Sequence, residues 1–279
     1  MSAVRARHDP PNIMNILLTG HKGFIGSHML AALAGHNVST FEWGDPLPVL
    51  LNTDWVIHMG AISSTTEKNI DRVFTQNYDF SVWLYEECKK RGVGFQFASS
   101  ASVYGITDCF QEGVELDPRS AYSWSKCLFE RYMLRNPSKY LTQVFRYFNV
   151  YGPEGEAHKG DQASPQYKFT RQAQETGVIQ IFEGSENYSR DFIHVGEIVK
   201  THLDFFHIKQ SDIWNLGTGK TKTFQSVAEE ISVKYNAKIE TIPMPDELKM
   251  SYQKYTCADM TKMNMVRWQS GPMQESAKL

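Results

Sequence analysis

The sequence predicts an α/β fold built on a doubly wound parallel sheet, and three observations support that prediction. Short apolar runs alternate with segments of helical spacing through the first half of the chain. A glycine-rich turn directly follows the first apolar run. The composition is globular, because 41% of the 279 residues are hydrophobic and only 22% are charged. Strands that alternate with helices form βαβ units, whose parallel sheet is covered by helices on both faces.

The predicted strands are short apolar runs bounded by glycine or polar residues. Those of the first half are Asn15–Thr19, Val38–Glu42, Trp55–His58, Phe95–Ser99 and Val144–Tyr147. Apolar residues at helical spacing lie between them, over Ser27–His36, Asn69–Lys90 and Ser120–Arg135. Only twelve residues separate Glu42 from Trp55, which leaves room for one short helix and for no additional strand. We therefore expect a sheet that is shortened by one edge strand.

The chain is expected to divide into a leader and two folded parts. Residues 1–13 contain two arginines and two prolines but no periodic apolar face, so we expect a disordered leader. Residues 14–152 carry the βαβ pattern and form the predicted main domain. Residues 153–279 hold fewer strands, at 178–182, 213–216 and 239–242, with helices at 166–175 and 223–236. These strands are too few for a separate sheet, which predicts a small α/β cap whose later strands partly return to the main domain.

Charge and cysteine content exclude several classes of partner. The chain has 29 Lys and Arg against 31 Asp and Glu, which gives no electrostatic reason for a nucleic-acid or membrane partner. No apolar run approaches the roughly 20 residues of a membrane span. Four cysteines lie far apart without metal-ligand spacing, so we expect no metal site, and reduced thiols suit the cytoplasm.

Gly20, Gly23 and Gly26 form the pattern GxxGxxG between the first strand and the first helix. In a Rossmann-type domain such glycines let the backbone approach a pyrophosphate, which lies at the helix N-terminus. A turn needed only for packing is the alternative. Glu42 follows the second strand, where a carboxylate accepts hydrogen bonds from a ribose 2′-hydroxyl and favours NAD. His21 and Lys22 are placed to attract a 2′-phosphate, which favours NADP, so the choice of cofactor stays open.

Tyr122 and Lys126 form the pattern YxxxK on a predicted helix, which places both side chains on one face. The strand before this helix ends in Ser99 and Ser100. These are the parts of a Ser-Tyr-Lys hydride-transfer site. The ammonium of Lys126 is expected to depress the pKa of Tyr122 and make it a usable base, while Ser100 orients the substrate oxygen. An ordinary amphipathic helix is the alternative for YxxxK alone.

Five motifs together resemble the extended short-chain dehydrogenase/reductase family: GHKGFIG at 20–26, HMGA at 58–61, SSASVYG at 99–105, YSWSK at 122–126 and RYFNVYGP at 146–153. HKG at 158–160, FEGSENYSRDF at 182–192 and NLGTG at 215–219 resemble those members that epimerise ADP-heptose. The resemblance implies a cytoplasmic homo-oligomer that inverts C6″ of a nucleotide sugar through transient oxidation. It also implies NADP as the bound cofactor and no nucleic-acid partner.

The resemblance also implies roles for individual residues. In that family a tyrosine and a second lysine are the bases on opposite faces of C6″, and here they correspond to Tyr122 and Lys159. Ser100 and Lys126 correspond to the supporting serine and lysine. The expected cofactor contacts are Gly20, Gly23, Phe24, Ile25, Gly26, Glu42, Met59, Gly60, Ala61, Ile62, Ser63, Asn77, Lys126, Val150 and Lys159. The expected substrate contacts are Ser100, Asn149, Asp161, Lys168, Phe182, Glu183, Gly184, Ser185, Arg190 and Tyr252.

Two of the substrate contacts depart from the family pattern, since Asp161 and Lys168 stand where the family has Ser and His. A different enzyme of the same family, such as a 4-epimerase or a keto-sugar reductase, therefore remains an alternative. A second alternative is a catalytically dead dinucleotide-binding sensor. The presence of Ser100, Tyr122 and Lys126 argues against a sensor, which needs only the glycine loop.

Overall fold

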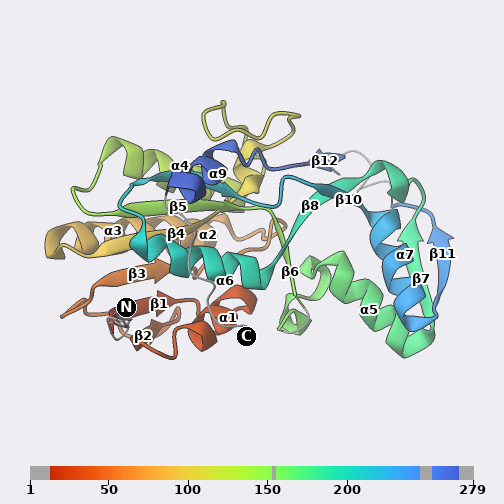
Figure 1. Cartoon of the computed structure of the whole chain (residues 1–279), viewed down its shortest axis with the longest axis horizontal. Helices are drawn as coiled ribbons and strands as arrows, with labels where there is room; N and C mark the ends of the chain where they lie inside the picture. Colours follow the sequence, from red (N-terminus) through yellow and green to blue (C-terminus); the bar gives the residue numbers. More distant parts are fainter. Residues whose placement is uncertain (1–12, 153–154, 246–252, 270–279) are drawn as a thin grey trace, which may run out of the picture.

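The structure, a computed structural model, describes residues 13–152, 155–245 and 253–269. Its centre is a parallel sheet of six strands in the order β2-β1-β3-β4-β5-β9. These strands are β2 (Asn37–Phe41), β1 (Asn15–Thr19), β3 (Trp55–His58), β4 (Gly94–Ser100), β5 (Thr142–Tyr147) and β9 (Asp212–Leu216). The flanking helices are α1 (Phe24–Ala32), α2 (Ile70–Phe74), α3 (Phe80–Arg91), α4 (Ala121–Arg135), α6 (Val195–Asp204) and α9 (Thr261–Gln269). Figure 1 shows helices on both faces of this sheet. The predicted doubly wound α/β fold is confirmed.

Side chains of the central strands alternate between two apolar layers, as the period of two in a strand requires. Leu17 of β1 lies in the layer that contains Leu84 of α3 and Phe129 of α4. Its neighbours Ile16 and Leu18 lie in the other layer, with side chains of α1 and α6. The strands are therefore buried on both sides, which explains why they read as continuous apolar runs in the sequence.

β2 is the edge of the sheet, and no described residue adds a strand beyond it. β2 pairs in parallel with β1, from Asn37 opposite Asn15 to Phe41 opposite Thr19. The segment that leads on to β3 contributes an isolated bridge between Trp43 and Asp45 instead of a strand. The common doubly wound order places one more strand outside β2. The expected loss of one edge strand is confirmed.

The helix expected over Asn69–Lys90 is present but contains one π-helical turn. α2 begins after Asn69, whose side chain accepts the amide of Arg72. The π-turn η1 (Thr75–Asp79) then leads directly into α3. Single π-turns inside α-helices are frequent at functional sites. Here the turn carries the buried side chain of Asn77.

The second half of the chain forms two small sheets that lie beside the main sheet in Figure 1. β7 (Val178–Phe182) and β11 (Lys238–Ile242) pair in parallel, and α5 (Pro165–Thr176) and α7 (Phe224–Tyr235) contribute to the same apolar cluster. β8 (Ser189–His194) pairs with β10 (Thr221–Thr223), β12 (Tyr255–Thr256) and β6 (Asn149–Tyr151). β9 returns to the main sheet. The division of the chain at residue 152 stays a prediction, and the predicted leader lies outside the described residues except for Ile13.

Six elements were not expected from the sequence: α6, α9, β6, β8, β10 and β12. The signal for α6 is present, because Val195, Ile198 and Val199 have helical spacing and are all buried. The strands β10 and β12 are only three and two residues long, and each exists by pairing with β8. Short 3₁₀ segments occur at Ala101–Tyr104, Ala157–Gln162, Ser185–Asn187 and Phe205–His207.

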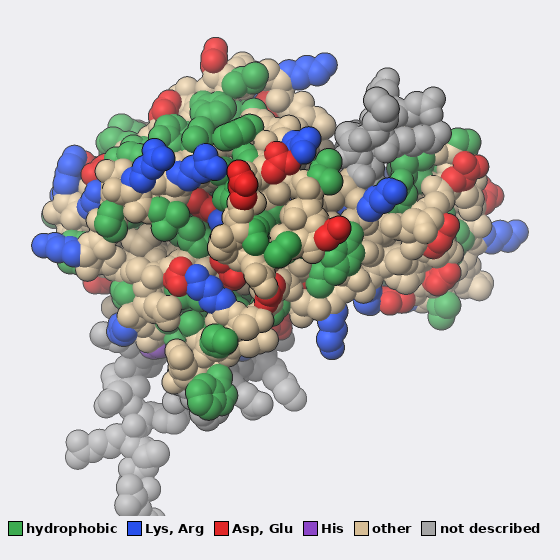
Figure 2. All heavy atoms as spheres, turned by 90° about the horizontal axis from the view of Figure 1, so that it is seen from above, with side chains coloured by type: hydrophobic (Ala, Val, Ile, Leu, Met, Phe, Trp, Pro, Cys, Tyr) green, Lys and Arg blue, Asp and Glu red, His purple; other side chains and the backbone are tan. Residues whose placement is uncertain are grey.

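The surface carries interspersed charges of both signs. Figure 2 shows Lys and Arg side chains among Asp and Glu on one face of the molecule, with apolar side chains between them. Within the described ranges, no helix has the length and apolar character needed to cross a membrane. In the same part of the chain, no three His, Cys, Asp or Glu side chains come together as metal ligands.

Candidate functional site

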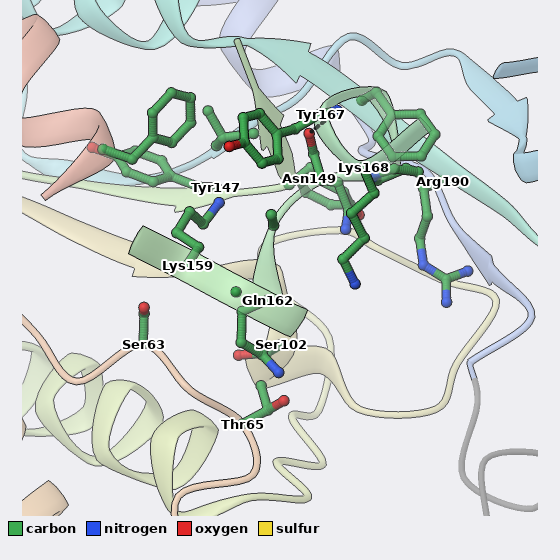
Figure 3. Close-up of a pocket in the computed structure, with 18 of the residues that line it drawn as sticks. Ser63, Thr65, Ser102, Tyr147, Asn149, Lys159, Gln162, Tyr167, Lys168 and Arg190 are labelled. Atoms are coloured by element: carbon green, nitrogen blue, oxygen red, sulfur yellow. Dashed lines mark hydrogen bonds between the residues drawn. The ribbon is translucent and has the colours of Figure 1, made fainter. Parts of the chain in front are cut away.

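A cleft of about 1240 Å³ opens at the carboxyl ends of the main strands and extends to the small sheets. It is lined by the glycine loop, the ends of β4 and β5, the start of α4, the 3₁₀ segment before α5 and parts of β7 and β8. Ligands of open parallel sheets bind at this edge, beyond the carboxyl ends of the strands. Figure 3 shows Tyr147 and Lys159 on one side of the cleft and Lys168 and Arg190 on the other, with Ser63 and Ser102 facing them.

The glycine loop leaves no room for side chains where it turns. Gly20 has a φ of +77°, and a Cβ on it would lie 2.5 Å from the Cα of Gly60. A Cβ on Gly26 would overlap the carbonyl oxygen of Gly20, so α1 packs directly against the turn. Gly23 is the N-cap of α1 and brings no side chain to satisfy the first amides of the helix. Backbone amides at the start of α1 therefore face the cleft, an arrangement that fits a pyrophosphate.

Glu42 lies directly after β2 and lines the cleft beside the glycine loop. Its Oε1 accepts the amide of Lys22 at 2.7 Å and lies 3.3 Å from Nδ1 of His21. The carboxylate is thus held by the same loop that would hold the phosphates. Together the bare glycine turn and this carboxylate fit a nicotinamide dinucleotide, with the carboxylate in position for the adenosine ribose.

Asn77 holds the loop after β3 from behind the cleft. Its Oδ1 accepts the amide of Ile62 at 2.8 Å, and its Nδ2 donates to the carbonyl of Ile62 at 2.9 Å. The same Nδ2 donates to Oγ of Ser125 in α4 at 3.2 Å. Asn77 and Ile62 were expected to contact the cofactor, but neither lines the cleft. The other expected residues of this loop do line it: Met59, Gly60, Ala61 and Ser63. The Asn77 side chain is turned into the core because it joins the loop to α4.

Ser100, Tyr122 and Lys126 all line the cleft, from the end of β4 and the first turns of α4. Ser120 caps α4 by accepting the amide of Ser123, and the helix begins at the next residue, Ala121. The Nζ of Lys126 donates to the carbonyl of Ala98 at 2.8 Å and lies 5.9 Å from the ring centre of Tyr122. The sequence pattern therefore does bring the three side chains together.

The electrostatics of this group differ from the expectation. Burial raises the pKa of Tyr122, and only the hydroxyl of Ser100 acts against it. Burial also lowers the pKa of Lys126 to about 7, although Glu130 one turn later raises it. The expected depression of the Tyr122 pKa by Lys126 is therefore wrong for this structure. The physical reason is that Lys126 is itself desolvated and directs its ammonium to the Ala98 carbonyl and the Phe97 ring.

Lys159 enters the cleft from the 3₁₀ segment before α5. Its Nζ donates to Oε2 of Glu156 at 3.1 Å and lies 4.8 Å from the ring centre of Phe24. Phe24 is the first residue of α1, and like Gly20, Gly23, Ile25, Gly26 and Val150 it lines the cleft. Lys159 is therefore placed at the junction between the glycine loop and the rest of the cleft.

Five of the expected substrate contacts line the far end of the cleft: Asn149, Lys168, Phe182, Ser185 and Arg190. Arg190 is buried, donates through Nη1 to the carbonyl of Ser189 at 2.9 Å, and lies 5.5 Å from the Phe224 ring centre. Glu183 and Gly184 do not line it, because Gly184 turns the chain with a φ of +77° and leaves Glu183 exposed. Tyr252 and the side chain of Asp161 lie outside the described residues.

The expected contacts did not include several residues of the cleft, although Ser102 and Tyr147 lie within the motifs SSASVYG and RYFNVYGP. Ser102, Tyr147, Gln162, Tyr167 and Gln253 line the cleft, and the hydroxyl oxygen of Ser102 is buried without a hydrogen-bond partner in the described residues. Glu156 is also unexpected; it does not line the cleft, but it precedes the 3₁₀ segment and pairs with Lys159. The others come from five separate segments, so no local spacing identifies them.

Comparisons with known proteins agree with the observed fold. The sequence model of the NAD dependent epimerase/dehydratase family matches residues 49–217. The fold is similar to that of the ADP-L-glycero-D-manno-heptose-6-epimerase of Helicobacter pylori, with a TM-score of 0.81 and 22% identity over 91% of this chain and 90% of that one. It is also similar to a UDP-N-acetylglucosamine 4-epimerase of Methanobrevibacter ruminantium, with a TM-score of 0.82 and 24% identity over 91% and 92% of the two chains.

A third similar structure is the UDP-glucose 4-epimerase of Thermus thermophilus, solved in complex with NAD. Its TM-score is 0.76, with 23% identity over 91% of this chain and 93% of that one. At such identities the similar structures establish the fold, and the family match covers more than half of the sequence. The chain belongs to the NAD dependent epimerase/dehydratase family.

Proposed function

We propose that the chain is a nucleotide-sugar epimerase that inverts C6″ of an ADP-heptose with a bound nicotinamide cofactor. The observation that carries the proposal is the presence of two separate proton-handling groups in one cleft. Tyr122 stands with Ser100 and Lys126 at the ends of β4 and α4, and Lys159 enters from another segment. Inversion at one carbon needs a proton carrier for each face, whereas a simple reductase needs one.

The roles of the residues follow from their positions. A bound nicotinamide supplies the means to take a hydride from C6″ and return it to the other face. Tyr122 and Lys159 each hold or receive the proton of the C6″ oxygen in one of the two orientations of the sugar. Ser100 donates a hydrogen bond to that oxygen. Lys126 lies on the same face of α4 as Tyr122, with its Nζ 5.9 Å from the Tyr122 ring centre, and brings a hydrogen-bond donor to the cleft.

The far end of the cleft suits the diphosphate and nucleoside of the substrate. Arg190 and Lys168 bring positive charge into it, and a guanidinium binds phosphate oxygens bidentately. Phe182 and Phe224 add aromatic surface for a base or sugar ring. The heptose is supported by the sequence motifs and by the similarity in fold to the Helicobacter pylori enzyme.

NAD is the cofactor we infer from the site itself. The Glu42 carboxylate beside the glycine loop repels a 2′-phosphate and accepts hydrogen bonds from a 2′-hydroxyl. The motif resemblance favours NADP instead, with His21 and Lys22 as its basic residues. Replacing Glu42 by serine tests which of the two dinucleotides the site prefers.

The deciding experiment is to incubate the purified protein with ADP-D-glycero-D-manno-heptose and follow the configuration at C6″ by NMR. Inversion is expected in the wild type. Tyr122→Phe and Lys159→Met are each expected to slow it by roughly 10²–10⁴, the usual contribution of a general acid–base group. Inversion at the wild-type rate in Lys159→Met under saturating substrate would remove Lys159 from the chemistry.

A 4-epimerase is the second candidate, and the fold similarity to the Methanobrevibacter enzyme favours it. The same NMR assay with UDP-glucose and UDP-N-acetylglucosamine distinguishes the two. Inversion at C4″ that survives Lys159→Met and is lost in Tyr122→Phe would support this candidate over the heptose epimerase.

A further inference from the structure

The carboxylate of Glu156 is completely buried, with 0% of its side chain exposed. It accepts hydrogen bonds from the amide and the hydroxyl of Ser164, each at 2.7 Å, and from the amide of Gly152 at 3.3 Å. All three of these donors are neutral. A buried carboxylate that meets only neutral donors is costly, and an opposite charge is needed to offset the loss of water.

Lys159 supplies that charge. Its Nζ lies 3.1 Å from Oε2 of Glu156, and this is the one ion pair of Glu156 among the residues that the structure describes. Glu156 directly precedes the 3₁₀ segment Ala157–Gln162, and Lys159 follows three residues later, so their side chains lie close to each other. The Lys159 side chain remains 22% exposed, so solvent is within its reach and its place in the cleft depends on what holds it.

Phe24 forms the other wall of the Lys159 site. The ammonium lies 4.8 Å from the centre of the Phe24 ring, a distance at which a cation and an aromatic face attract. The ring is buried, and it packs so closely on Gly152 and Gly155 that a Cβ on either residue would lie within 3.0 to 3.3 Å of it. The ammonium therefore lies between a buried carboxylate and a buried ring at the start of α1.

We infer that Glu156 is a positioning residue that holds the ammonium of Lys159 in the cleft against Phe24. The inference rests on the proposed function, in which Lys159 carries a proton at C6″. A glutamine at position 156 can accept the amide of Ser164 through Oε1 and donate through Nε2 to the Ser164 hydroxyl, but it lacks the negative charge that attracts the ammonium. The anchoring of the loop and the positioning of the lysine can therefore be separated by experiment.

The test is a double-mutant cycle in thermal stability, with Glu156→Gln, Lys159→Met and the pair. Each single change leaves a buried or half-buried charge without its partner, and we expect each to lower the Tm by roughly 5 °C or more. The double variant should lose clearly less than the sum of the two. The matched control is the same cycle at Glu87 and Lys90, which are also three apart, with Nζ and Oε1 separated by 2.8 Å on an exposed helix face. That cycle should be additive within about 1 °C.

A second readout follows Lys159 directly. Reductive methylation of the folded protein, quantified by peptide mass spectrometry, should modify Lys159 several-fold faster in Glu156→Gln than in the wild type. Ser164→Ala removes one neutral donor to Glu156 and keeps its charge, so it should leave the Lys159 rate unchanged. With an epimerisation substrate, Glu156→Gln should lower kcat while KM changes little.

An additive Glu156–Lys159 cycle together with an unchanged methylation rate would overturn the inference and reduce Glu156 to an anchor of the loop. A non-additive cycle in a protein that inverts no sugar nucleotide would leave the positioning intact and refute the proposed function. Should Glu156→Gln fail to fold, Lys159→Arg and Lys159→Met replace it. Arginine keeps the ion pair and should retain the Tm, and an equal Tm for the two variants would contradict the inference.

Discussion

Glu42 is the residue on which the choice between the two dinucleotides depends. It faces the cleft and is fixed by the amide of Lys22. Replacing it by serine removes the carboxylate, and with it both the hydrogen bonds to a 2′-hydroxyl and the repulsion of a 2′-phosphate. Hydrogen bonds to a charged group contribute about 1.5–3 kcal/mol, so the affinity ratio should shift toward NADP by roughly tenfold or more.

Fluorescence titration with NAD and NADP, before and after Glu42→Ser, measures that ratio. Asp45→Asn is the matched control, because Asp45 accepts the amide of Glu42 at 2.8 Å but does not line the cleft. An unchanged ratio in Glu42→Ser would show that this carboxylate is not at the ribose.

Lys126 links the site to the pH dependence of stability. Burial lowers its pKa from 10.5 to about 7 in the folded chain, so between these values the unfolded chain holds a proton that the folded chain has released. The unfolded state then binds more protons, and stability rises with pH over this window and falls as pH drops toward 7. Lys126→Met removes this contribution. The Tm of the variant, measured by circular dichroism from about pH 7 to pH 9, should rise less with pH than that of the wild type.

The difference between the two proteins isolates the contribution of Lys126 from those of the other titratable groups. Lys262→Met serves as the control, because this lysine lies outside the cleft and is partly exposed. Parallel pH profiles for the wild type and Lys126→Met would refute the prediction.

At the scale of elements, a chain of buried polar side chains joins α6 to the main sheet. Tyr147 at the end of β5 meets Nε2 of His202 at 2.6 Å, and Nδ1 of His202 meets Oε1 of Gln96 at 2.7 Å. Nε2 of Gln96 donates to Oε1 of Gln143 at 2.9 Å. Gln143 in turn donates to the carbonyl of Phe205 at the end of α6. Burial lowers the pKa of His202 to about 3, so the ring is neutral. Its Nδ1 therefore donates to Oε1 of Gln96, and its Nε2 accepts the hydrogen bond of the Tyr147 hydroxyl.

Gln96→Leu interrupts this chain in the middle. The change removes the Gln96 amide, which now bonds to three groups. These are Nδ1 of His202, the backbone carbonyl of His202 and Oε1 of Gln143. Each unsatisfied buried group costs about 1–3 kcal/mol, and the gain from leucine offsets part of it, so we expect a loss of roughly 2–4 kcal/mol. Urea unfolding measures the change. The exposed Gln174→Leu on α5 should stay within about 0.5 kcal/mol, and an equally small effect of Gln96→Leu would show that the chain of bonds is dispensable.

At the scale of the whole molecule, the sheet depends on residues far beyond the predicted main domain. β9 pairs with β5 along its length, and Trp214 of β9 packs with Phe145 and with Ile198 and Phe205 from the α6 region. A fragment of residues 14–152 lacks β9, α6 and α9 and would expose Phe145 at an open edge. We therefore expect it to show no cooperative urea transition, whereas residues 14–279 should unfold like the full chain. A cooperative transition in the short fragment would mean that the sheet is complete without β9.

The amino-acid sequence by itself determined the features whose signals are local. Each apolar run marks a strand because both of its faces are buried, and the glycine spacing marks a tight turn because a Cβ does not fit there. Tyr122 and Lys126 are brought to one face by helix geometry alone. The missing edge strand follows from a short linker, since a chain of fixed length has a limited reach. These predictions depend on neighbours within a few residues of one another.

The tertiary structure decided what distant residues do to one another. His202 and Gln96 meet across 106 positions of sequence, and the cleft is closed by side chains from both halves of the chain. The pKa of Lys126 is set by the depth of its burial, which no spacing reveals, and the expected effect on Tyr122 failed for that reason. Asn77 turned inward to bind Ile62 and Ser125. Such contacts depend on how the complete core packs, because burial and desolvation are properties of the assembled molecule and not of any segment.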